Sequence, residues 1–188
     1  MLFKPLIAGF IISSLLSPGI ALSSPPKDAN LIASLSKNKE KSAMNNQDVI
    51  EHLKSLVHYE IDHSFLLAQA VHNLKDSETI QKVGSYRDAV EDNISQLSTA
   101  IEKLGGEVPE HSRDFKGFFM QGYAALRGIA SDYGVLQALD SNEKLILDAY
   151  EKVSRLDLPQ EAKEVIQKSY DKDKSLFQTI QTQAEKLK

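Results

Sequence analysis

The spacing of apolar residues from about residue 47 onward constrains the fold more than any other feature of this sequence. These residues recur every three or four positions, the period of one face of a packed α-helix, and no strand-like alternation accompanies them. We call such a set of same-face positions a stripe. One stripe consists of Val83, Tyr86, Val90, Ile94, Leu97, Ile101 and Leu104. The sequence therefore predicts an all-α fold.

The stripes predict four long helices of similar length, over residues 47–75, 77–104, 131–156 and 159–187. Gly105 and Gly106 provide a residue that can adopt positive φ and end the second helix, and Pro159 is suited to the first position of the fourth. The first two helices are joined tightly, as are the last two. A long aromatic stretch connects the pairs and predicts a shorter helix near 114–129. This is the connectivity of a bundle of two helical hairpins joined by one crossover.

Three acidic residues interrupt the stripes where apolar residues are expected. Glu60, Glu143 and Asp173 each have mostly apolar neighbours three or four positions away on both sides, and each lies near the middle of its helix. At about 100° per residue these side chains point inward with the leucines and isoleucines. If the helices pack as full-length neighbours, we expect the three carboxylates to meet at one level of the bundle.

A buried ionised carboxylate costs several kcal/mol unless it is paired or ligated. One divalent ion, iron or manganese, would satisfy three of them, since such ions accept hard oxygen donors. His63 follows Glu60 in a Glu-x-x-His arrangement that places both side chains on one helix face. The predicted metal ligands are therefore Glu60, His63, Glu143 and Asp173. In the structural alternative, the acids only pair with neighbouring donors, which are Arg87, Tyr86, Tyr150 and Tyr170.

Several local motifs add a resemblance to a known family. They are the run from Ile94 to Pro109 with its Leu-Gly-Gly end, Glu143 followed by Ala149-Tyr150, the Leu158-Pro159 pair, and Tyr170. Over residues 48–188 the chain resembles ferritin-like and rubrerythrin-like proteins, and it is most similar to an uncharacterised bacterial four-helix-bundle family carried as a domain of unknown function. The resemblance implies a ferritin-like four-helix bundle.

The chain departs from the metal-binding members of that superfamily at two places. Those relatives carry Glu-x-x-His on helices two and four, whereas this sequence has Val90 and Asn93 in helix two, and Leu176 and Phe177 in helix four where a histidine is wanted. The complete di-iron ligand set is therefore absent. We expect a non-catalytic binding or stress-related envelope protein whose degenerate site holds a single ion or only water and hydrogen bonds. The alternative is an iron-dependent oxidase or peroxidase with an unorthodox site.

The N-terminal segment predicts export. Lys4 precedes an apolar stretch over residues 6–22 that Pro18 and Gly19 interrupt, a pattern typical of a signal peptide cleaved near Ser23. An uncleaved membrane anchor is the alternative. The predicted organisation is a signal peptide over 1–23, a flexible linker over 24–46 and the bundle over 47–188. The mature chain is then periplasmic or secreted, without stable membrane insertion.

Composition excludes several classes of site and partner. The chain has no cysteine, which rules out disulfides, thiolate metal sites and cysteine nucleophiles. Its net charge of −4 argues against a nucleic-acid partner, since phosphate binding needs a positive field. Aromatic residues in the crossover predict either a contact with a second copy or another protein, or a cap on the bundle core. They are Phe115, Phe118, Phe119 and Tyr123.

Overall fold

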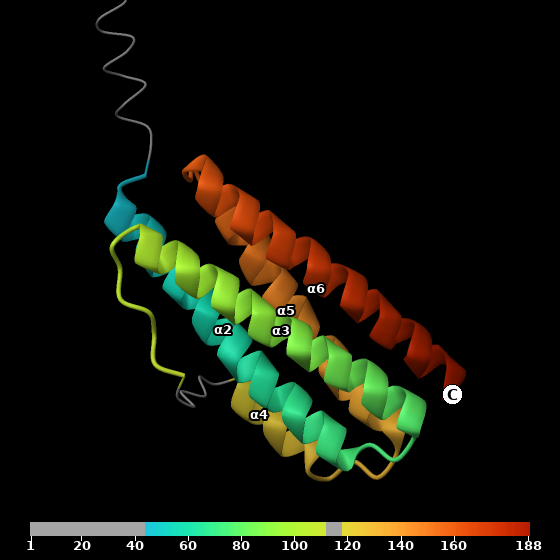
Figure 1. The fold of residues 1–188 in the computed structure, drawn as a ribbon. Helices are drawn as coiled ribbons and strands as arrows, with labels where there is room; N and C mark the ends of the chain where they lie inside the picture. The colour runs from blue at the N-terminus through green and yellow to red at the C-terminus, as the bar shows by residue number, and fades with distance from the viewer. Residues whose placement is uncertain (1–43, 112–117) are drawn as a thin grey trace, which may run out of the picture. The chain divides into compact units, whose positions relative to one another are not determined.

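The computed structural model describes residues 44–111 and 118–188, and for residues 118–121 it describes the backbone alone. Within these ranges the chain forms five helices and no strand (Figure 1). They are α2 (Asn46–Asn73), α3 (Ser77–Lys103), α4 (Phe118–Leu126), α5 (Asp132–Ser154) and α6 (Gln160–Lys186). The all-α prediction is confirmed, and each long helix begins and ends within two residues of its predicted bounds.

Local sequence explains where the helices begin and end. Asn45, Asp76 and Ser131 precede α2, α3 and α5, and each side chain accepts a hydrogen bond from a backbone N–H of the first turn, which satisfies a donor that lacks a helical partner. Gly105, with φ of 81°, follows the C-cap of α3. Pro159 was predicted as the first residue of the fourth helix; it instead occupies the N-cap, without a side-chain hydrogen bond.

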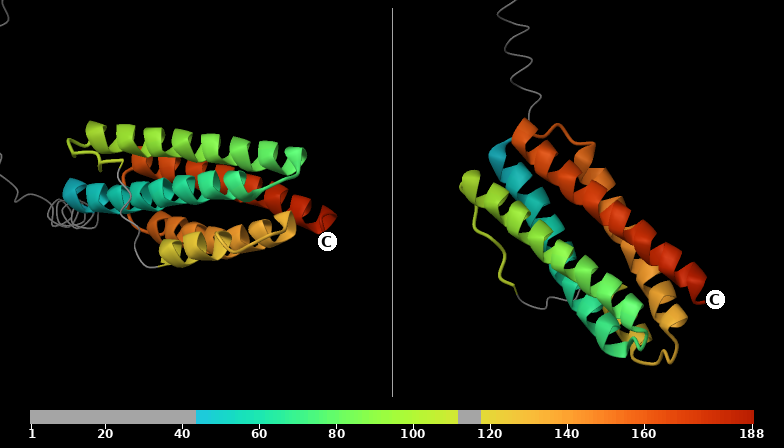
Figure 2. Two further views of the ribbon diagram at one scale, coloured as in Figure 1. Left: turned by 90° about the horizontal axis from the view of Figure 1, so that it is seen from below. Right: turned by 45° about the vertical axis from the view of Figure 1, so that its right-hand side comes forward.

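Each long helix packs against two others, and neighbouring helices run antiparallel (Figure 2). Helix α2 contacts α3 and α5, while α6 completes the ring by contacting the same two helices. At one end, Met44 N–H donates to the carbonyl of Asp157 in the α5–α6 turn. At the other end, the carboxylate of Asp132 accepts bonds from the backbone of Lys75 and Asp76 in the α2–α3 turn. The connection from α3 to α5 therefore spans the length of the bundle.

Helix α4 lies in this connection and packs against α2 and α5. Leu126 is fully buried, and Tyr123 is half-buried against the core, as expected if the crossover covers one side of the bundle. Phe115 lies outside the described residues, and only the backbone of Phe118 and Phe119 is described. The predicted contact surface on the crossover therefore stays a prediction.

The stripes face the interior. All members of the α3 stripe are buried except Leu104, which is half-buried. Helix α2 packs against α4 as well as α3 and α5, and its buried face is wide and includes Ile61, Leu66 and Ala70. In the described part of the chain, no helix has the length and apolar character needed to cross a membrane. The predicted signal peptide and nearly all of the predicted linker lie outside the described residues.

Candidate functional site

The structure brings Glu60, His63, Glu143 and Asp173 together inside the bundle. Their side chains are at most 2% exposed. Glu60 and His63 lie on α2, Glu143 on α5 and Asp173 on α6, and all four lie close to the middle of their helices. Since Glu60, Glu143 and Asp173 occupy stripe positions, the packing that buries their apolar neighbours also turns them inward.

His63 connects the two glutamates. Its Nε2 lies 3.1 Å from Glu143 Oε2, and its Nδ1 lies 3.7 Å from Glu60 Oε2, which is too long for a hydrogen bond. The i, i+3 spacing of Glu60 and His63 places them one above the other on the same face of α2. The ring of Tyr86 packs edge-to-face against His63, with ring centroids 5.1 Å apart. This contact fixes the plane of the imidazole.

Asn93 of α3 connects Glu60 with Asp173, so that all four long helices contribute to one cluster. Its Nδ2 donates to Glu60 Oε1 at 3.2 Å and to Asp173 Oδ1 at 3.0 Å. The hydroxyl of Tyr150 also donates to Glu60 Oε1. We refer to Glu60, His63, Asn93, Glu143 and Asp173 as the central cluster.

The sequence prediction left Asn93 out of the candidate ligands and noted it only where a histidine was expected. A signal for its burial exists, because Asn93 lies three residues after Val90 and four before Leu97, both of which are buried. A polar residue at such a spacing on α3 belongs to the same inward face.

Six buried polar atoms in and beside the central cluster have no hydrogen-bond partner within the described part of the chain. They are Glu60 Oε2, His63 Nδ1, Asn93 Oδ1, Glu143 Oε1, Asp173 Oδ2 and Ser169 Oγ. Most buried polar atoms in proteins are satisfied, because an unpaired one loses its bonds to water without replacement. A concentration of six at one level of a bundle therefore calls for a specific explanation.

Burial and mutual repulsion shift the protonation of the central cluster. Burial would lower the pKa of His63, but the negative charges of Glu143 and Glu60 outweigh it and raise that pKa from 6.5 to about 9. Burial, reinforced by repulsion from Glu60 and Glu143, raises the pKa of Asp173 well above its usual value. Burial, together with these carboxylates, likewise raises the pKa of Tyr86 and of Tyr150 far above 10. The interior therefore favours states in which these groups carry protons.

The other donors considered for the acids lie elsewhere. Arg87 pairs with its neighbour Asp88 at 3.1 Å, and Tyr170 donates to Glu151 at 3.1 Å. Of the tyrosines, Tyr150 binds a carboxylate of the cluster, and Tyr86 donates to the backbone carbonyl of Asp173 at 3.4 Å. Of the four donors in the structural alternative, only Tyr150 thus binds a carboxylate oxygen of the cluster, Oε1 of Glu60. The other carboxylate oxygens contact members of the cluster or have no partner.

In the arrangement observed, the side chains of the cluster pair with one another instead of surrounding one point. Among residues 44–111 and 118–188, no group of three or more His, Cys, Asp or Glu side chains is set to hold a metal ion as it stands. The chemistry of the donors nevertheless fits a divalent cation, since three carboxylates and one imidazole are ligands that iron and manganese accept. The unpartnered atoms are those with which such an ion would interact.

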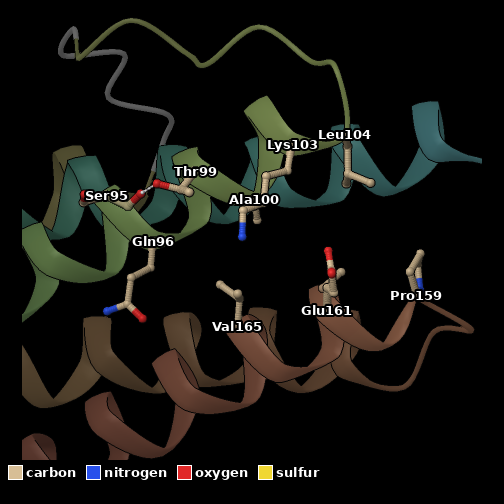
Figure 3. A pocket seen from close by; sticks show the side chains of 10 residues that line it. Ser95, Gln96, Thr99, Ala100, Lys103, Leu104, Pro159, Glu161 and Val165 are labelled. Carbon is tan, nitrogen blue, oxygen red and sulfur yellow. Dashed lines mark hydrogen bonds between the residues drawn. The ribbon is translucent and has the colours of Figure 1, made fainter. Parts of the chain in front are cut away.

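A surface pocket of about 270 Å³ lies apart from the central cluster, between the end of α3 and the start of α6 (Figure 3). Its lining combines apolar residues with a lysine, a glutamate and uncharged polar residues. Lining residues include Gln96, Thr99, Lys103, Leu104, Glu161 and Val165. No residue of the central cluster lines it, so the pocket does not give access to the buried carboxylates.

Comparison with known proteins identifies the family of this chain. A family described as "Domain of unknown function (DUF2383)" matches residues 48–156, more than half of the chain. The match spans α2 to the end of α5 and includes Glu60, His63, Asn93 and Glu143, while α6 with Asp173 follows it. No curated protein and no solved structure matches the chain.

Proposed function

The chain belongs to this family, the domain of unknown function DUF2383, and we propose that it binds one divalent metal ion, iron or manganese, at the centre of its bundle. The ligands would be Glu60, His63, Glu143 and Asp173. The observation that carries the proposal is the set of buried donor atoms without partners, which includes one oxygen from each of the three carboxylates and one nitrogen of the histidine.

Charge supports the same proposal. Three carboxylates lie in the interior with one histidine as the only basic group in contact with them among the described residues. Two lysines flank Asp173 in the sequence: Lys172 instead binds Asp92 on the surface at 2.7 Å, and the ammonium of Lys174 lies 5.6 Å from the centre of the Tyr170 ring. Several buried negative charges repel one another, and a divalent cation offsets this repulsion more effectively than hydrogen bonds do.

Binding requires the unpartnered donor atoms, which do not surround one point in the arrangement observed, to converge on the ion. The contact between His63 Nε2 and Glu143 Oε2 uses one polar atom of each side chain, so that Nδ1 of His63 and Oε1 of Glu143 would be the atoms that bind the ion. An ion of this kind supplies Lewis acidity and, for iron, redox chemistry. We assign the chain the role of a binding protein, because its donors lie in a closed apolar interior and the pocket between α3 and α6 lies elsewhere.

Metal analysis of the purified protein tests the proposal. The protein would be incubated with Mn²⁺, or with Fe²⁺ without oxygen, then desalted and analysed for bound metal. We expect one ion per chain, and a loss of binding in Glu143→Gln and Asp173→Asn. Asp92→Asn is a matched control, because Asp92 is an acid adjacent to Asn93 whose side chain pairs with Lys172 on the surface. No bound metal in the wild type, or equal binding in all variants, would contradict the proposal.

We further propose that the bundle is a member of the ferritin-like superfamily. Two antiparallel helical hairpins joined by a crossover along the bundle support this, as do acidic residues at mid-height. An experimental structure would test the assignment, because its helix order and crossing geometry could be superimposed on those of ferritin-like proteins. A different handedness of the crossover would contradict it.

Export is proposed from the N-terminal pattern of Lys4 followed by the apolar stretch over 6–22. The mature protein would then be periplasmic or secreted, in agreement with a stress-related envelope role. Mass spectrometry of the protein isolated from its own cells should give a mature N-terminus near Ser23. A full-length chain retained in the membrane fraction would instead support the anchor.

A further inference from the structure

The side chain of Asn93 contacts two of the proposed ligands, Glu60 and Asp173, from α3, the long helix that supplies none of the four ligands. It is 1% exposed, and its amide nitrogen donates to Glu60 at 3.2 Å and to Asp173 at 3.0 Å. Its amide oxygen, Oδ1, is buried and has no hydrogen-bond partner in the described part of the chain. The amide nitrogen of this side chain is therefore used, while its amide oxygen is buried without a partner.

We infer that Asn93 is a further ligand of the proposed metal ion through Oδ1, and that it biases the site toward ions that prefer oxygen, such as Mn²⁺. The inference rests on the proposed function. It adds a fifth ligand and a preference among metal ions to the four-ligand proposal. An amide oxygen is a hard, neutral donor of the kind that suits manganese, magnesium and calcium.

The pattern of used and unused oxygens supports this role. Each of the three carboxylates has one oxygen in contact with a protein donor: Glu60 with Asn93 and Tyr150, Asp173 with Asn93, and Glu143 with His63. The second oxygen of each lacks a partner, as does the amide oxygen of Asn93. One set of contacts thus orients the carboxylates, which leaves four oxygens, one from each long helix, for an ion.

Asn93 could act as a hydrogen-bond donor through its nitrogen or as a metal ligand through its oxygen, and the two roles predict different effects of substitution. If Asn93 only donates hydrogen bonds that position Glu60 and Asp173, an aspartate at this place would be harmful, because it cannot donate and adds a negative charge. If Asn93 binds the ion through its oxygen, an aspartate supplies an even better oxygen ligand. A histidine replaces the oxygen with an imidazole nitrogen, which favours Zn²⁺.

The experiment uses the full chain and three variants, Asn93→Asp, Asn93→His and Asn93→Leu. Dissociation constants for Mn²⁺ and Zn²⁺ are measured by competition with a fluorescent chelator, and thermal melts with and without Mn²⁺ show that each variant folds. The control is Gln183→Leu, which removes another buried amide, one that binds Thr79 at 2.9 Å and Lys82 at 2.6 Å well away from the cluster.

We expect Asn93→Leu to weaken Mn²⁺ binding by about tenfold or more. Asn93→Asp should bind Mn²⁺ at least as tightly as the wild type and show a larger rise in melting temperature on adding Mn²⁺. Asn93→His should raise the ratio of Zn²⁺ to Mn²⁺ affinity, while the control leaves both constants unchanged. If the wild type binds Mn²⁺ and Asn93→Leu has the same dissociation constant, Asn93 is not a ligand. The same conclusion follows if Asn93→Asp binds Mn²⁺ more weakly than Asn93→Leu. Either result would overturn the ligand role of Asn93 but not the proposed function. A wild type that binds no metal would overturn the proposed function as well.

Discussion

The metal-free protein should lose stability as the pH rises from 6.5 to 9, and His63 is the main reason. The imidazole is fully buried beside Glu143 and Glu60, whose charges outweigh the effect of burial and raise its pKa from 6.5 to about 9. The folded chain therefore keeps this proton at pH values where the unfolded chain has released it. The stabilisation is fully present below pH 6.5 and disappears as the pH passes through 9.

The magnitude follows from the two pKa values. A difference between 6.5 and about 9 corresponds to about 3 kcal/mol of unfolding free energy. This is a large part of the ~5–15 kcal/mol that stabilises a typical domain. Asp173 acts in the same direction, because burial and its acidic neighbours raise its pKa, so that rising pH also removes a proton that the folded state prefers to keep.

Urea unfolding in the presence of a chelator measures the effect at pH 6 and pH 9.5. We expect the wild type to be less stable at the higher pH by about 3 kcal/mol, and His63→Gln to lose most of this difference. His72→Gln should keep it, since His72 is exposed on the same helix. Equal stability at both pH values, or a gain in stability at pH 9.5, would refute the reasoning.

Five further substitutions, at four positions, test the packing and the cluster by urea unfolding at constant pH. A Cβ at Gly106 would lie 2.8 and 2.9 Å from methyl groups of two buried isoleucines, so Gly106→Ala should destabilise the protein by about 1–3 kcal/mol. A Cβ at Gly84 in α3 meets no atom within 4 Å, so Gly84→Ala should stabilise the protein by about 0.5–1 kcal/mol. Ser131→Ala removes the N-cap of α5 and should cost about 1 kcal/mol, with Ser131→Thr retaining most of the stability. Tyr150→Phe removes a donor to buried Glu60 and should cost about 1–3 kcal/mol in the metal-free protein; an unchanged stability would show that this bond is dispensable.

Much of the fold could be predicted because local signals agree with the apolar spacing. Capping residues such as Asn45 and Asp76 directly precede α2 and α3, and Gly105 directly follows the last residue of the α3 stripe. Short turns also make adjacent hairpins the natural arrangement. The place of the crossover could not be predicted in the same way, because several faces of a bundle can accept a short apolar helix. In the structure this helix, α4, packs against α2 and α5.

The residues of the central cluster were predictable to the extent that they interrupt a stripe. Glu60, Glu143 and Asp173 do so clearly, and His63 follows from its spacing to Glu60. Asn93 was missed as a candidate ligand because asparagine is common on exposed helix faces and carries no charge that demands compensation. The pairing of the carboxylates with His63 and Asn93 depends on how each helix is rotated about its own axis in the bundle. One sequence does not determine that rotation.

An experimental structure of the protein crystallised with Mn²⁺, with anomalous diffraction recorded at the manganese edge, tests the central claim most directly. The account predicts one anomalous peak for each chain, inside the bundle and within bonding distance of carboxylate oxygens of Glu60, Glu143 and Asp173. No interior peak at saturating Mn²⁺, with the contacts of His63 and Asn93 unchanged, would contradict it and leave the cluster as a purely hydrogen-bonded core.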